Sequence, residues 1–115
     1  MTKPEMLSVG TIIRDPIKDS SGKEVGKFVD FMVDMETNTI PYVIIALNYR
    51  DGYVGVPWEI FKKGDQHDFL VDVEVSKLMD APGFPENEWP DVTKRDFAER
   101  VSKHFGTRIL GRRMT

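Results

Sequence analysis

The chain of 115 residues contains no cysteine, which excludes disulfide bonds, thiolate metal sites and a cysteine nucleophile. Its longest apolar run, Tyr42 to Leu47, is far shorter than the ~20 residues that a membrane-spanning helix needs. The first ten residues lack the basic and apolar segments of a secretory signal peptide. We therefore expect one soluble, cytoplasmic domain, because a chain of this length is too short for two independent cores.

Groups that carry out catalysis are also scarce. Asp30 and Asp34 have no histidine beside them, so we interpret them as strand-end residues that accept hydrogen bonds from backbone amides. Asp65, His67 and Asp68 share one loop, but a second histidine is not nearby. The sequence has no glycine-rich phosphate loop and no serine in a strand–turn–helix nucleophile setting. We predict no catalytic residue, no cofactor and no bound metal, and hence no enzyme.

The charge of the chain is unevenly distributed. The net charge of −3 disfavours a general nucleic-acid binder, which needs a basic face. Residues 1–93 carry 9 Lys and Arg against 17 Asp and Glu, whereas residues 94–115 carry 7 against 2. The basic tail is expected to dock on its own acidic body or on that of a second copy, and an anionic partner such as nucleic acid or lipid is the alternative.

Short apolar runs separated by turn residues predict a mainly β fold. The run from Ile40 to Leu47 is apolar at nearly every position, which is typical of a strand buried on both faces. Gly26 lies inside another run and indicates a bulge or a sharp bend. Five or six strands at about ten-residue spacing favour a small antiparallel barrel or sandwich. The expected strands cover residues 9–13, 25–33, 40–47, 53–58 and 69–73, and the first should end at the turn signal Asp15-Pro16.

The last third of the chain predicts a short helix, a strap and a longer helix. We expect the short helix over residues 75–79. Residues 82–92 hold three of the seven prolines, which prevent a regular helix, and therefore predict an extended strap over the barrel. Residues 94–105 should form a helix with Thr93 as its N-cap, Asp96 completing a capping box, and Gly106 as its terminator.

Five residues are candidates for an interaction site. Phe97, Val101 and Phe105 form one apolar stripe on the predicted C-terminal helix, which either the chain's own barrel or a second chain could bury. Trp58 and Trp89 could anchor a partner, because tryptophan dominates interface energetics. Alternatively, Trp58 caps the barrel and Trp89 pins the strap. His104, at the end of this helix, is expected to act as a cation near the negative helix terminus.

The order of these segments resembles the PRC-barrel family, the small β-barrel shared by the photosynthetic reaction centre H subunit and ribosome maturation proteins. The matching pieces run through most of the chain: Val9-Gly10, residues 21–26, residues 29–34, residues 40–43, Val56-Pro57-Trp58, residues 78–82, residues 88–91 and His104-Phe105-Gly106. The last two pieces are similar to the H-subunit-like branch. Because nothing here can serve as that subunit's membrane helix or as a second barrel, the resemblance implies a stand-alone soluble member.

We therefore predict a small antiparallel PRC-type β-barrel with a short helix, a proline-rich strap and a C-terminal helix. Residues 1–92 are expected to form the domain and residues 93–115 a docking extension. The expected function is a non-enzymatic protein-interaction module that forms a homodimer, with the tail in the interface. The alternative is an RNA- or ribosome-associated factor that uses the basic tail. A small-molecule enzyme or sensor would need a polar pocket that these residues do not build.

Overall fold

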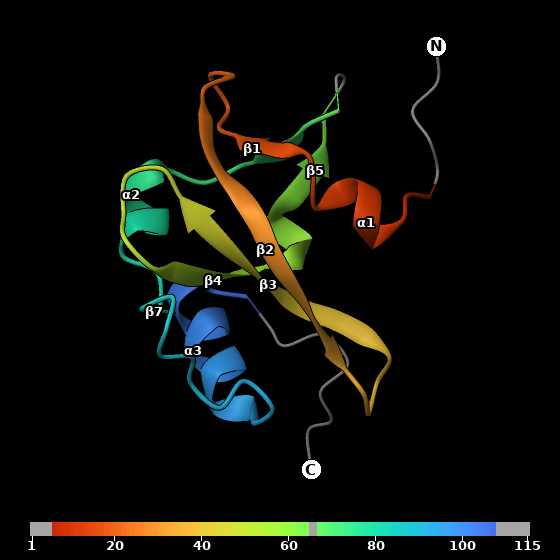
Figure 1. The fold of residues 1–115 in the computed structure, drawn as a ribbon, viewed down its shortest axis with the longest axis vertical. Helices are drawn as coiled ribbons and strands as arrows, with labels where there is room; N and C mark the ends of the chain where they lie inside the picture. The colour runs from red at the N-terminus through yellow and green to blue at the C-terminus, as the bar shows by residue number, and fades with distance from the viewer. Residues whose placement is uncertain (1–5, 65–66, 108–115) are drawn as a thin grey trace.

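The computed structural model describes residues 6–64 and 67–107, and a seven-stranded sheet forms its centre (Figure 1). The strands lie in the order β5-β6-β1-β2-β3-β4-β7. β2 and β3 are the longest strands, and their hairpin crosses the molecule diagonally. The strand bounds are β1 Pro16–Lys18, β2 Glu24–Asp34, β3 Thr39–Leu47, β4 Tyr53–Pro57, β5 Phe61–Lys63, β6 Phe69–Val71 and β7 Gly83–Phe84.

The sheet is mainly antiparallel and curves around a core, but it does not close into a barrel. Strands β5 and β7 stand at its two edges and pair with no further strand among the described residues. One pair, β1 with β6, is parallel, contrary to the fully antiparallel arrangement that we expected. The long connection between these two strands makes this possible, because β1 joins β6 only after the chain has passed through β2 to β5.

Apolar side chains are buried on both faces of the central strands, as the continuous apolar run of β3 predicted. Val43 and Ile45 belong to the larger core cluster inside the curved sheet. Tyr42 and Ile44 point to the opposite face, into a second cluster. Because the side chains of both clusters are buried, neither face of β3 exposes a row of side chains to solvent at the centre of the strand.

Three register shifts interrupt the pairing of β2, one with β1 and two with β3. β2 contains an extra residue at Val25 opposite β1 and another at Val29 opposite β3. The predicted irregularity at Gly26 is therefore displaced by one residue, and Gly26 has a different role. A side chain there would lie 2.4 Å from the backbone oxygen of Ala46, so only glycine allows β2 to approach β3 so closely. Near the hairpin end, two residues of β3 including Pro41 oppose one of β2, which suits a residue without a backbone N–H.

The first predicted strand is wrong, because Val9–Ile12 forms the short helix α1. The backbone N–H of Thr11 donates to Ser8 Oγ at 3.1 Å, so Ser8 acts as an N-cap that outweighs the β propensity of the segment. The helix turns Ile12 into the larger core cluster. Pro16, expected to belong to a turn, instead opens β1, a strand position that proline tolerates.

The two other predicted helices lie close to their predicted positions, and a short helix that was not predicted lies at Trp58–Ile60. A 3-10 helix η1 spans Trp58–Ile60, α2 spans Val75–Met79, and α3 spans Arg95–Phe105. Gly106 ends α3 in the left-handed conformation, as predicted. The predicted capping box is wrong: Lys94 is the N-cap, and the hydroxyl of Thr93 donates to Asp91 instead. Asp91 also accepts the backbone N–H of Thr93, so this local turn takes up Thr93 before the helix begins.

Candidate interaction site

Helix α3 covers the outer face of the sheet and buries most of its apolar stripe there. Phe97 and Val101 are 3% and 1% exposed and pack in the second core cluster. The rings of Phe97 and Tyr42 lie 5.5 Å apart, and Phe105 is half-buried against both clusters. The stripe therefore contacts the chain's own sheet. Of the two burial surfaces that the sequence left open, the structure shows the intramolecular one.

The two ends of α3 are attached to different elements, the end of β2 and helix α2. At its start, Arg95 donates two hydrogen bonds to Asp34, at 2.7 and 3.1 Å, and lies 3.4 Å from Glu36. The Arg95 guanidinium lowers the pKa of the Asp34 carboxyl below its ordinary value. At the other end, His104 Nε2 donates to the backbone oxygen of Lys77 at 2.8 Å. His104 thus joins α3 to α2, a contact that the expected electrostatic role did not include.

Asp34 also stabilises the turn between β2 and β3. Its carboxylate accepts the backbone N–H groups of Glu36 and Thr37, as the sequence interpretation expected. Asp30 likewise accepts the N–H of Phe31. Arg95 as the partner of Asp34 was not predicted, because 61 residues separate the two. The only sequence signal for this contact was the opposite net charge of residues 1–93 and residues 94–115.

The two tryptophans take part in aromatic clusters of the chain. Trp58 is half-buried on η1 and contacts four rings of the larger core, including Phe31 and Phe61 at 5.3 and 5.8 Å between centroids. Trp89 packs against Phe84 at 4.8 Å and donates its indole N–H to the backbone oxygen of Glu86. Its ring also lies 5.7 Å from that of Tyr53 on β4, which joins the strap to the sheet, yet 40% of Trp89 stays exposed.

A groove of about 360 Å³ lies between the β2–β3 hairpin and the start of α3, and we call it the hairpin groove. Val33 and Met35, which line its hairpin side, are 53% and 80% exposed. The wider groove described below has neither of these side chains nor any other exposed large apolar side chain in its lining. The lining residues are Met32, Val33, Asp34, Met35, Glu36, Pro41, Tyr42, Val92, Thr93, Lys94, Arg95 and Ala98.

Tyr42, which lines this groove from β3, carries a polar atom that is not satisfied. Its hydroxyl is buried and has no hydrogen-bond partner among the described residues. Burial raises the pKa of Tyr42 to about 12, so the group stays protonated at neutral pH. A buried hydroxyl without a partner costs about 1–3 kcal/mol of stability.

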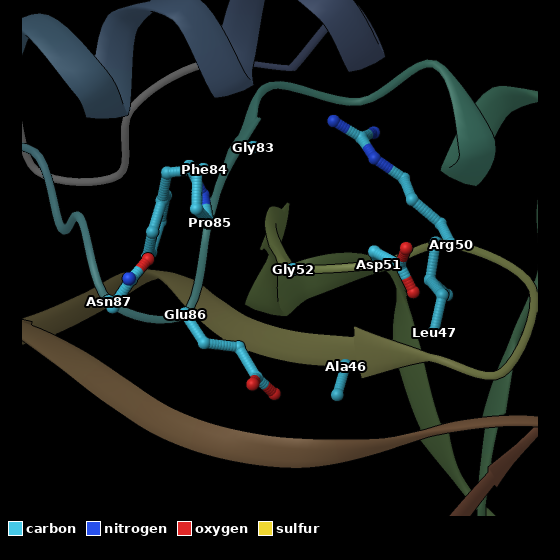
Figure 2. Close-up of a pocket in the computed structure, with 10 residues that line it drawn as sticks. All are labelled: Ala46, Leu47, Arg50, Asp51, Gly52, Gly83, Phe84, Pro85, Glu86 and Asn87. Atoms are coloured by element: carbon cyan, nitrogen blue, oxygen red, sulfur yellow. The ribbon is translucent and has the colours of Figure 1, made fainter.

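A second, wider groove of about 800 Å³ lies between the β3–β4 turn and the strap (Figure 2). Asp51 and Glu86 contribute carboxylates to it. The Arg50 guanidinium points away from Glu86 and donates to the backbone oxygens of Met79 and Ala81 at 2.8 and 2.7 Å. Arg50 therefore ties the turn to the end of α2 and to the segment after it, and both of these bonds engage its guanidinium within the chain.

The loop that carries Asp65, His67 and Asp68, for which the sequence predicted no bound metal, is described only in part. Asp68 is buried and lies 3.1 Å from Lys18 Nζ, His67 is exposed, and Asp65 lies outside the described residues. In residues 6–64 and 67–107 no three His, Asp or Glu side chains are placed to share a metal ion. Within the same residues, no helix is long and apolar enough to cross a membrane.

Comparison with protein families gives a match over most of the sheet. The family model of the PRC-barrel domain matches residues 4–77, which extend from before α1 into α2. No curated protein matches the chain. The matched segment holds six of the seven strands and the larger core cluster except Leu78 and Ala81, whereas the strap, β7 and α3 follow it. Since the match covers well over half of the sequence, the chain belongs to the PRC-barrel domain family.

Proposed function

We propose that the protein is a non-enzymatic module that binds other proteins and associates with itself in the cytoplasm. The observation that supports this best is the pair of exposed apolar side chains, Val33 and Met35, beside the hairpin groove. Single exposed apolar residues are ordinary, but neighbouring ones that line a groove mark a surface that another molecule covers. Trp89, the most exposed of the five residues singled out in the sequence, offers a further aromatic face to a partner.

Sedimentation velocity of the wild-type chain over a concentration series tests self-association. We expect the mean mass to rise from one chain toward two between about 1 and about 500 μM, the range in which small interfaces associate. Because the contact is mainly apolar, added salt should leave the association largely unchanged. A single-chain mass at every concentration would contradict the proposal.

Binding of RNA through the basic tail is the less supported function. Arg95 already bonds Asp34, and the Arg100 guanidinium lies 5.5 Å from the centroid of the Phe97 ring. Arg95 and Arg100, two of the basic tail residues that the structure describes, thus have partners within the chain. Fluorescence anisotropy with labelled RNA separates the two functions, because phosphate contacts weaken steeply with salt. Tight, strongly salt-dependent binding would favour the RNA-associated function over the one proposed.

A further inference from the structure

We propose that the hairpin groove is occupied by the β2–β3 hairpin of a second copy of this chain, in a two-fold symmetric dimer. This inference rests on the self-association proposed above and assigns a surface to it. In such a dimer the same patch of both copies forms the contact, so the patch must be complementary to itself. The hairpin groove meets this requirement in shape and in charge.

In shape, the patch combines an exposed apolar side chain, Met35, with the apolar groove beside it. Met35 is 80% exposed at the hairpin end, and Val33 is exposed beside it. The adjacent groove has an apolar lining from Pro41, Val92 and Ala98. A two-fold axis through this patch brings Met35 of each copy to the groove of the other. An unbranched methionine side chain adapts well to such an irregular apolar space.

The charge argument concerns the two walls of the groove. Glu36 lies on the hairpin wall and Lys94 on the helix wall, and both are exposed. Under two-fold symmetry, Glu36 of each copy comes opposite Lys94 of the other, which gives two equivalent ion pairs. Within each chain Arg95 pairs with Asp34 and also lies 3.4 Å from the exposed Glu36 carboxylate, so the groove lining holds two carboxylates and two cations. The patch therefore has no surplus charge that would repel a second copy, although the whole chain carries −3.

The other surfaces fit a second copy less well. The wider groove is lined by Asp51, Glu86 and Arg50. Because the Arg50 guanidinium is bonded to the backbone oxygens of Met79 and Ala81, the two carboxylates leave this groove with a net negative charge that would repel the same groove of another copy. The apolar stripe of α3 is already buried against β3 and β4. Trp89 is exposed, but it lies on the strap beside the acidic groove and packs on Phe84 and Tyr53. The hairpin groove is therefore the surface that supports a symmetric contact.

The first experiment compares Met35→Glu with Met6→Glu by sedimentation velocity. Met6 is the matched control, because it is 88% exposed and does not line the groove. We expect Met35→Glu to weaken the dimer by about tenfold or more, since it buries a carboxylate in an apolar contact. Met6→Glu should leave the dissociation constant within about threefold of wild type. Both variants should keep the wild-type far-UV spectrum, because neither side chain belongs to the core.

The second experiment reverses the charge on one wall of the groove in each of two variants and then mixes the two variants. Glu36→Lys alone and Lys94→Glu alone each place like charges opposite one another in both symmetric contacts, and each variant should dimerise at least about tenfold more weakly. An equimolar mixture of the two variants restores an opposite pair in both contacts. We expect the mixture to form heterodimers with an affinity within about threefold of wild type. This recovery depends on the location of the contact and not on the stability of either chain.

The outcomes separate the two proposals. If the wild-type chain stays monomeric, the proposed self-association itself is wrong. If it dimerises but Met35→Glu dimerises equally well, or the mixture fails to recover, then another surface forms the dimer and the assignment to the hairpin groove is wrong. Equal weakening by Met6→Glu would also overturn the assignment, because it would show that any added surface charge disrupts the association.

Discussion

Asp34 connects three parts of the molecule through one carboxylate. It accepts two backbone N–H groups of the β2–β3 turn and two hydrogen bonds from Arg95 at the start of α3. Only 5% of its side chain is exposed, whereas 66% of the Glu36 side chain remains in solvent. The two carboxylates that face Arg95 therefore differ in their surroundings, and they should differ in energetic importance, because exposed ion pairs contribute little.

Asp34→Asn should destabilise the fold more than the control Glu36→Gln does. Asp34 is buried, so water cannot replace the hydrogen bonds that its carboxylate loses, whereas water can do so at the exposed Glu36. The pKa of Asp34 is lowered in the folded state, so its charge stabilises the fold above the ordinary value of 3.8. That stabilisation is lost as the pH falls through the lowered pKa. Urea unfolding of both variants at pH 7 and in the acid range measures the difference. An effect of Asp34→Asn that is equally large at low pH would contradict the assignment to charge.

At the scale of elements, the packing of α3 on β4 depends on the absence of a side chain at Gly55. A Cβ atom at this position would lie 2.7 Å from both the Phe97 ring and a Val101 methyl group. Gly55 thus allows the helix to lie directly on the strand. No local sequence signal indicates this role, because Phe97 and Val101 meet Gly55 only through the tertiary fold.

We expect Gly55→Ala to displace α3 and to reduce the free energy of unfolding by about 1–3 kcal/mol, the usual cost of overpacking a core. Gly10→Ala is the matched control. Its added methyl meets only Ser8 Oγ, at 4.0 Å, and Gly10 lies in α1, where alanine is the better helix former. It should be neutral or stabilise by about 1 kcal/mol. Chemical denaturation measures both, and equal stability of the two variants would show that α3 does not press on β4.

At the scale of the whole molecule, the family match ends at residue 77, but the packed structure does not. The strap, β7 and α3 contribute Phe84, Phe97, Ala98 and Val101 to the second core cluster. Without them, the outer face of β3 would expose Tyr42 and Ile44. That residues 1–92 form a domain with a docking extension remains a prediction. The packing of the second core cluster favours a chain that folds as one unit.

Removal of the residues after Val92 tests this view. We expect the truncated chain to lose most of its stability, since loss of a single buried phenylalanine costs about 3–5 kcal/mol and small domains have only about 5–15 kcal/mol. A chain that ends at Thr107 is the control, because it retains α3. Thermal unfolding by circular dichroism, together with binding of a hydrophobic dye, measures the loss. If the chain truncated after Val92 had the same midpoint of thermal unfolding as the chain that ends at Thr107, α3 would not be needed for stability.

The sequence by itself determined the mainly β class, the position of β3 and its burial on both faces, the short helix α2 and the end of α3 at Gly106. These features depend on local patterns, such as a continuous apolar run or a glycine after an amphipathic segment. Val9–Ile12 could be interpreted wrongly because its β-branched residues and its N-cap Ser8 favour different structures, and only core packing selects between them.

Only the tertiary structure decided the remaining features. The parallel pairing of β1 with β6, the open edges of the sheet and the contact between Asp34 and Arg95 all join segments that lie far apart in the chain. The hairpin groove is of the same kind, since its two walls come from residues 32–42 and 92–98. Periodicity and propensity act over a few neighbouring residues, whereas these arrangements depend on which surfaces are left to be covered after the core has formed.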